Sequence, residues 1–389
     1  MKYLICAWIF ISGPAVSRAA EMYWTDEARD AYTLVSALRV DEGLTLIRLH
    51  AITHPDNLIW PYLEDYAEFI RIFTQEDMRK MPAFLEASTR RLERIASVPE
   101  SNPLSLMAQG QILLHQCALH LQQGQFFAAA TDINQSFKLL RKNQKLHPED
   151  VANLRLYASL KVAFGAVPDQ YRFLVSILTS LTGTIEEGLH ELHTILKTTT
   201  PANNIFFNET VLITALAEGA LDNNPHSGLE LIYTYLGREP DTKIVQYFMA
   251  TLLIADGQND GAIRVLSRTT GAPGSEKIPF LDFMLGECKL FRGDNDADVY
   301  FKNFLVFHKG KHFIKEAHQK LAWFDLLHDD RNGYFNHMQQ ILIKGAATTD
   351  EDQAALKEAE THATPHPVLL RARLYYDGGY YDQSLAQLP

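Results

Sequence analysis

Apolar residues recur at helical spacing along most of the chain, and the clearest example is residues 244–266, IVQYFMATLLIADGQNDGAIRVL. Within this stretch the small residue Ala250 is followed seven positions later by Gly257, and five positions after that by Ala262. The pattern predicts a helix, a tight turn at the glycine and a second helix that runs back along the first. The two alanines would lie where the helices touch, because a large side chain there would force the backbones apart.

The same order of small residue, turn residue and small residue recurs along the chain and indicates an internal repeat. Its first positions at 215, 250, 286 and 322 are separated by 35, 36 and 36 residues. This period, with small residues at the helix contacts, resembles the tetratricopeptide repeat (TPR), a helix pair of about 34 residues. The residues that we assign to repeat packing are Cys117, Gly124, Ala129, Ser176, Gly183, Gly188, Ala250, Gly257, Ala262, Gly286, Gly293, Ala372 and Gly379.

The repeat is irregular. Asp298 and Tyr334 stand where the family prefers a small residue, and two intervals between units are longer, at 59 and 50 residues. The resemblance implies an all-α fold in which antiparallel helix pairs stack into a right-handed α-α superhelix, a solenoid. After residues 1–19, we expect an N-terminal helical region of degenerate repeats over 20–102, TPR-like helical repeats over 103–200, and a TPR-like solenoid over 201–389 with a helical insertion near 345–364.

The first nineteen residues have the layout of a secretory signal peptide. Lys2 gives a positive start, residues 4–11 form an apolar run, and Ser17 and Ala19 are small residues at the spacing of a cleavage site. An uncleaved membrane anchor is the alternative, although the run is shorter than the ~20 residues that a membrane-spanning helix needs. We therefore expect residues 1–19 to be removed and the mature protein to be exported to the periplasm or cell envelope.

Composition places the chain among ordinary globular proteins. Of its 389 residues, 47% are hydrophobic and 21% are charged, which excludes collagen-like and wholly disordered chains. The formal net charge of −11 argues against nucleic acid as a partner, because phosphate binding needs a positive field. Beyond the signal segment, Cys117 and Cys288 are too few to form a disulfide framework, and we expect two buried thiols.

Patterns that would signal catalysis or metal binding fail on spacing or context. His190 and His193 are three residues apart, whereas the zincin helix places its two histidines four apart. The acidic stretch that begins at Asp294 resembles a calcium loop but has no glycine at its sixth position. His308 and His312 are four apart, but they span an expected turn and need further ligands. We therefore expect no catalytic residues, no metal and no cofactor.

One local charge reversal stands out in this acidic chain. Residues 302–320 contain five lysines and three histidines against the single acid Glu316. The segment has two interpretations. It is either a solvated helix end and turn, or an anchor for an acidic peptide terminus or an anionic surface, since lysines bind such groups as point charges. In the second interpretation Lys309, Lys311 and Lys315 contact the partner.

A superhelix of helix pairs exposes a long concave surface, and such surfaces usually hold a segment of another protein. Residues 164–192 and 300–323 are in addition similar to stretches of outer-membrane-associated and inclusion-body-clearance TPR proteins. Because residues 173–181 are nearly uncharged, membrane association is an alternative to a buried helix there. We expect an exported scaffold for protein–protein interaction in the bacterial cell envelope. The alternative is an envelope protein that binds a small molecule or glycan on a TPR-like frame. The sequence sets no oligomeric state.

Overall fold

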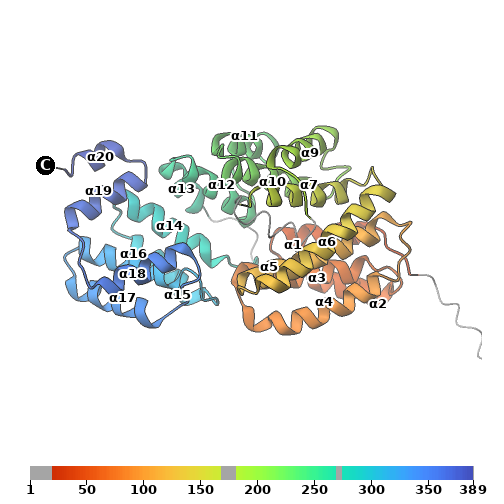
Figure 1. Cartoon of the computed structure of the whole chain (residues 1–389), viewed down its shortest axis with the longest axis horizontal. Helices are drawn as coiled ribbons and strands as arrows, with labels where there is room; N and C mark the ends of the chain where they lie inside the picture. Colours follow the sequence, from red (N-terminus) through yellow and green to blue (C-terminus); the bar gives the residue numbers. More distant parts are fainter. Residues whose placement is uncertain (1–19, 168–180, 269–273, 389) are drawn as a thin grey trace, which may run out of the picture.

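The computed structural model describes residues 20–167, 181–268 and 274–388 (Figure 1). These residues form nineteen α-helices and no β-strand. Neighbouring helices pack in antiparallel pairs, and each pair also contacts the next helix along the chain. The expectation of an all-α fold of adjacent helix pairs is therefore confirmed. Among the described residues, no helix is long and apolar enough to cross a membrane.

In the first half of the chain the pairs are α1 (Asp26–Ser36) with α2 (Val40–Thr53), α3 (Ile59–Gln75) with α4 (Met81–Ile95), α5 (Pro103–Gln122) with α6 (Phe126–Leu146), and α7 (Val151–Gly165) with α9 (Ile185–Thr198). In the second half they are α10 (Phe207–Leu216) with α11 (Pro225–Tyr235), α12 (Lys243–Ala255) with α13 (Asn259–Leu266), α14 (Pro279–Arg292) with α15 (Ala297–Phe307), α16 (Ile314–Leu327) with α17 (Arg331–Ile343), and α19 (Pro367–Asp377) with α20 (Tyr381–Leu385). The single helix α18 (Asp350–Thr361) lies in the expected insertion and packs on α16 and α17. We call the two members of a pair its first and second helix.

Local sequence explains where these helices begin and turn. Proline occupies the first position of α5, α11 and α19, where its missing N–H costs nothing. Four expected turn glycines, at 124, 257, 293 and 379, have φ between 69° and 82°. This left-handed conformation is disfavoured for residues with a Cβ, so a glycine after the first helix lets the chain reverse in a short turn.

The expected small residues lie at helix contacts. Ala250 and Ala262 are both completely buried in the core shared by α12 and α13. A Cβ on Gly188 would lie 2.6 Å from the carbonyl oxygen of Ala158, so α9 approaches the backbone of α7 directly. A Cβ on Gly286 would lie 3.2 Å from ring atoms of Phe301 on α15, so this glycine makes room for an aromatic ring between α14 and α15.

Three of the other residues that we assigned to repeat packing lie at helix contacts. Cys117 and Ala129 are buried between α5 and α6, and Ala372 is buried between α19 and α20. Gly183 precedes α9, and Ser176 lies outside the described residues. Tyr334 breaks the small-residue pattern but is 2% exposed, and its hydroxyl donates to the carbonyl of Ala363 at 3.3 Å. This unit therefore accommodates a large side chain by giving its hydroxyl a partner beyond the helix contact.

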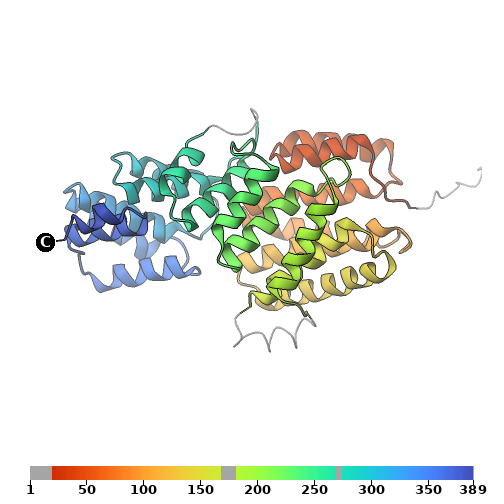
Figure 2. The ribbon, with the colours of Figure 1, turned by 90° about the horizontal axis from the view of Figure 1, so that it is seen from above.

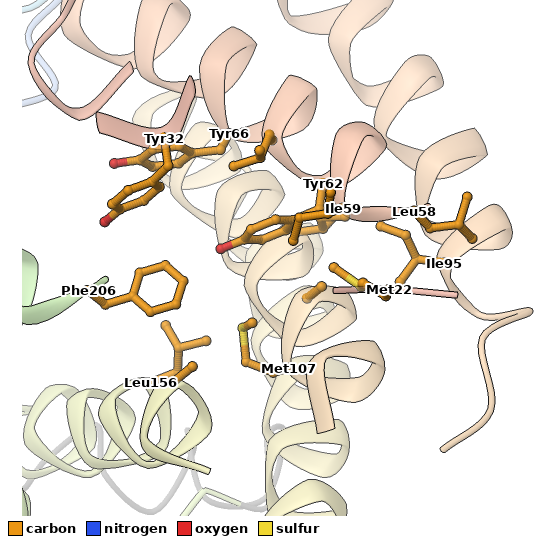
Figure 3. Packing of buried hydrophobic residues seen from close by; sticks show 14 of the residues in the cluster. Met22, Tyr32, Leu58, Ile59, Tyr62, Tyr66, Ile95, Met107, Leu156 and Phe206 are labelled. Atoms are coloured by element: carbon orange, nitrogen blue, oxygen red, sulfur yellow. The ribbon is translucent and has the colours of Figure 1, made fainter. Parts of the chain in front are cut away.

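The early helices lie at one end of the long axis of the molecule and the late helices at the other (Figure 2). The largest core joins α1 to α7 and receives Phe206 from the start of α10. Figure 3 shows Tyr32 and Tyr66 near Phe206, with Leu156 and Met107 beside them. The Tyr32 and Phe206 ring centroids are 5.2 Å apart, so the first and fifth pairs meet inside this half of the molecule. Two further cores lie within α10–α14 and α14–α19.

Candidate functional site

The basic segment, residues 302–320, lies partly against the end of α3, more than 230 positions earlier in the chain. His312 Nδ1 is 3.0 Å from Glu76 Oε2, and His308 Nε2 is 3.5 Å from the same oxygen. Lys309 Nζ donates to Gln75 Oε1 at 2.5 Å and lies 3.8 Å from Asp77 Oδ2. The connection between α15 and α16 is thus held by the end of α3.

The local backbone makes this contact close. Glu76 ends α3 with φ 49°, in the left-handed conformation that terminates a helix. A Cβ on Gly310 would meet the Glu76 carboxylate at 2.0 Å, so the loop comes this near because position 310 has no side chain. His308 and His312 flank Gly310 in the sequence. Because Gly310 has no side chain, both imidazole rings can approach the Glu76 carboxylate.

A second set of contacts lies beside the first. Arg71 Nε binds Glu276 Oε1 at 2.7 Å, and its Nη2 binds Asp41 Oδ1 at 2.6 Å. The backbone N–H of Glu276 donates to the carbonyl of Leu38 at 2.8 Å. The first two pairs are therefore fixed to the loops before α14 and α16. We call this group of contacts, from residues 38–41 and 71–77 to residues 276 and 308–312, the clasp.

The charges in the clasp balance one another. The hydrogen bond to Glu76 raises the pKa of His312, although partial burial opposes the shift. Burial lowers the pKa of His308, which is held more strongly in its neutral form. The hydrogen bond from Arg79 lowers the pKa of Asp77, which stays ionised beside Lys309. The positive charge of this loop is met by acids of the same chain.

The remaining lysines of the basic segment are engaged to different degrees. Lys302 pairs with Asp298 at 2.6 Å, and buried Lys320 lies 2.8 Å from Glu287 Oε1. Lys315 is 5% exposed and its ammonium group donates to the carbonyl of Ile341. Lys311 is exposed. The interpretation in which Lys309, Lys311 and Lys315 contact a partner therefore does not hold for Lys315, because its side chain is buried in the contact between α16 and α17.

This burial predicts opposite results for two lysines four residues apart. We expect Lys315→Gln to lower the free energy of unfolding by about 1–3 kcal/mol, because the shorter side chain leaves the buried Ile341 carbonyl without its donor. Lys311→Gln, the matched control, should change it by less than about 0.5 kcal/mol, as exposed substitutions usually do. Urea unfolding followed by circular dichroism measures both. Equal effects of the two changes would contradict the placement of Lys315.

Histidines that could suggest a metal site have partners within the protein. His115 Nδ1 is 2.8 Å from Asp65 Oδ1, and His193 Nε2 is 2.6 Å from Glu218 Oε1. Over residues 20–167, 181–268 and 274–388, no group of three or more His, Cys, Asp or Glu side chains is placed to hold a metal ion. Cys117 and Cys288 are free and buried, as expected, and burial raises the pKa of the Cys117 thiol to about 12.

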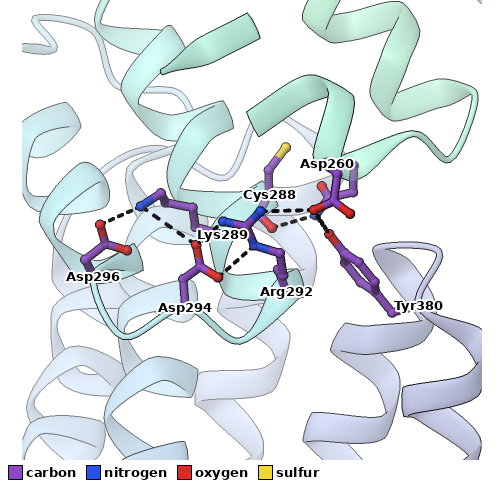
Figure 4. Close-up of polar contacts among 8 residues, drawn as sticks. Asp260, Cys288, Lys289, Arg292, Asp294, Asp296 and Tyr380 are labelled. Atoms are coloured by element: carbon purple, nitrogen blue, oxygen red, sulfur yellow. Dashed lines mark hydrogen bonds and ion pairs between the residues drawn. The ribbon is translucent and has the colours of Figure 1, made fainter. Parts of the chain in front are cut away.

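The acidic turn after α14 binds cations of the protein itself (Figure 4). Asp294 accepts two hydrogen bonds from Arg292, at 2.8 and 2.5 Å, and Asp296 lies 2.5 Å from Lys289. Arg292 also reaches Asp260 at 3.0 Å, and Asp260 accepts the hydroxyl of Tyr380 at 2.9 Å. This turn therefore ties α13, α14 and the start of α20 together.

A second polar cluster is buried among the first helices of four pairs. Arg155 of α7 is 2% exposed and binds Glu209 Oε2 of α10 at 3.0 Å and Gln111 Oε1 of α5 at 3.3 Å. Two tyrosines of α3 complete the cluster, since Tyr66 donates to Glu209 at 2.6 Å and Tyr62 donates to Gln111 at 2.8 Å. Burial, and then the Glu209 charge, raise the pKa of Tyr66, so its hydroxyl keeps the donated proton. The cluster fixes the relative positions of these helices.

Both clusters escaped the sequence analysis for the same reason. Glu76 is more than 230 positions from His312, and Tyr66 is 143 positions from Glu209, so no local spacing connects them. The residues expected to form a signal peptide, and residues 173–180 of the uncharged stretch, lie outside the described part of the chain.

No protein-family model matches the sequence, and no curated protein matches it at a significant level. The class of the protein therefore rests on its own residues. The described part is an all-α array of helix pairs whose polar clusters bind its helices to one another.

Proposed function

We propose that the protein is an exported TPR-like scaffold that binds a protein or peptide partner in the bacterial cell envelope, without catalysis. The proposal combines the 35- to 36-residue spacing of small residues with the pairing of adjacent helices. First helices also pack on the first helices of neighbouring pairs, as in α1 on α3, α3 on α5 and α12 on α14. In a right-handed superhelix of such pairs the first helices line the concave surface, which is the part that binds partners.

The observation that carries the proposal is an aromatic row on these helices. Tyr247 of α12, Phe280 of α14 and Phe313 at the start of α16 follow one another, with ring centroids 6.4 and 4.7 Å apart. All three are partly exposed. Aromatic side chains are enriched at protein interfaces because they offer large contact areas with little loss of conformational entropy. We therefore place the partner-binding surface over α12, α14 and the start of α16.

Site-specific photo-crosslinking in the envelope tests this surface. Benzoylphenylalanine in place of Tyr247 keeps an aromatic ring in the row, and the matched control carries it in place of Arg264, an exposed residue of the second helix α13. The expected result is a discrete adduct from position 247 and none from position 264. Adducts from both positions, or from position 264 alone, would move the binding surface away from the first helices.

Export is tested separately by cell fractionation and N-terminal sequencing. We expect a product that begins at or near Ala20 in the periplasmic or membrane fraction, because the charged start, apolar run and small-residue site occur in that order. Recovery of the full-length chain in the cytoplasm would contradict export to the cell envelope. It would not affect the proposal that the protein binds a partner as a scaffold.

A further inference from the structure

The last helix pair does not continue the order of the array. Its first helix, α19, packs on α14 and α16, which are the first helices of two earlier pairs (Figure 1). The repeat pattern at Ala372 and Gly379 does produce a helix pair, and Ser384 Oγ donates to the carbonyl of Ala372 at 2.7 Å. What the repeat spacing did not reveal is that this pair folds back over helices that precede α18.

The contact has the form of an amphipathic helix seated on two others. Leu370 and Leu374, four residues apart, are 4% and 2% exposed and belong to the core of α14–α19. Between them in sequence, Arg373 places its guanidinium 5.3 Å from the ring of Trp323 on α16. At the end of the helix, a Cβ on Gly378 would lie 2.8 Å from Cβ of Phe291 on α14. Leucines at i and i+4 on a groove of two helices are one of the recurring modes of peptide recognition.

A few polar contacts hold the pair in place at its turn (Figure 4). The Tyr380 hydroxyl donates to Asp260 at 2.9 Å and accepts from Asn259 Nδ2 at 3.0 Å. Beside it, a Cβ on Gly379 would lie 2.9 Å from the carbonyl oxygen of Gly257. At this turn the anchor therefore consists of the Tyr380 side chain, which binds two residues of α13, and one close approach of two turns. Within α19, Arg371 Nη2 adds a hydrogen bond to the carbonyl of Leu327 on α16 at 3.2 Å.

Few residues seat α19. Three of its eleven residues, Leu370, Ala372 and Leu374, are buried, and Ala372 faces α20. Beside them, a pocket of about 230 Å³ that is open to solvent lies among α14, α16 and α19, with Asp294, His328 and Arg371 among its lining residues. The apolar contact that holds α19 on α14 and α16 is therefore small. The pair also exposes large apolar residues, Leu369 and Tyr376 on α19 and Tyr381 and Leu385 on α20.

We infer that the surface of α14 and α16 is a helix-binding groove, that α19 occupies it from within the same chain, and that a partner helix with the pattern of α19 displaces it. Such a partner carries two leucine-sized residues four apart and a cation that faces Trp323. The inference rests on the proposed scaffold function and adds the groove and the chemistry of its occupant. While α19 of the same chain fills the groove, the partner cannot bind. The apparent affinity for the partner is therefore the intrinsic affinity multiplied by the fraction of molecules in which the groove is open.

The test uses the full chain and a fluorescent synthetic peptide of residues 366–388 as the probe. Tyr380→Phe removes two hydrogen bonds that hold α19 in place but none of the groove. We expect it to tighten apparent peptide binding about thirtyfold, because each of the two lost hydrogen bonds contributes about 1 kcal/mol to the closed state. Tyr381→Phe is the matched control, since Tyr381 is 57% exposed, and it should leave binding unchanged.

Two further measurements make the result decisive. A peptide with alanine at the positions of Leu370 and Leu374 should lose binding to the Tyr380→Phe variant, and native-state hydrogen exchange should open α19 at least about tenfold more often than α14. If Tyr380→Phe unfolds the chain, Arg373→Ala replaces it. Failure of the peptide to bind any folded variant, together with exchange of α19 only on global unfolding, would overturn the groove. The crosslink from position 247 is independent of α19, so the scaffold proposal would survive that outcome.

Discussion

Arg155→Met is expected to lower the free energy of unfolding by about 3 kcal/mol. Breaking a buried ion pair by removal of one partner costs roughly 3–5 kcal/mol, because the other charge is left uncompensated. The lower end applies because the Glu209 side chain is 20% exposed and water can reach part of it. Methionine fills similar volume, so the loss reports the charge and hydrogen bonds more than a cavity. Urea unfolding followed by circular dichroism provides the measurement.

A double-mutant cycle separates the ion pair from general damage to the core. Glu209→Gln removes the charge that Arg155 neutralises and keeps an oxygen for the Tyr66 hydroxyl. We expect the double variant to be more stable than Arg155→Met alone, with a coupling of about 1–3 kcal/mol. A loss below about 1 kcal/mol for Arg155→Met, or strictly additive effects, would show that the cluster does not hold the four pairs together.

The sequence predicted the helix pairs because their determinants are local. Gly257 adopts a positive φ within one turn, and Ala250 and Ala262 lie in the core of one pair, so thirteen consecutive residues contain the whole interaction. Proline at the first position of α5, α11 and α19 is similarly local. A helix pair can be inferred from one sequence when the residues that determine it lie within about 35 positions of one another.

The candidate sites could not be inferred in this way. The lysines and histidines of residues 302–320 were correctly recognised as a charge reversal, but their partner Glu76 sits at the end of α3. Likewise the repeat spacing placed the last helix pair within the solenoid over 201–389, but it gave no sign that α19 packs on both α14 and α16. Both contacts join helices or loops that are far apart in the sequence, and no local spacing of residues encodes such a contact. Long-range contacts therefore enter only with the three-dimensional structure.

Acid is expected to destabilise the protein through His318 of α16. This side chain is 5% exposed, and its Nδ1 lies 3.0 Å from Nδ1 of His337. Burial, and then the nearby His337, Lys344 and Lys315, lower the pKa of His318 to about 4. In the unfolded chain a histidine has a pKa of about 6.5. Below this pH the unfolded state binds the proton more readily than the folded state, so the free energy of unfolding decreases as the pH decreases. By about pH 5 this linkage amounts to about 2 kcal/mol.

His318→Gln should remove this loss. We expect the variant to lose about 2 kcal/mol less stability than the wild type between about pH 8 and about pH 5, as measured by urea unfolding across that range. Asp325 acts in the opposite direction, because burial raises its pKa to about 6 and its contribution to stability is lost as pH rises. Both proteins retain Asp325, so the comparison cancels it. His366→Gln, a change at an exposed histidine, is the control and should follow the wild-type curve. Parallel curves for wild type and His318→Gln would mean that the His318 and His337 pair takes up a proton without strain.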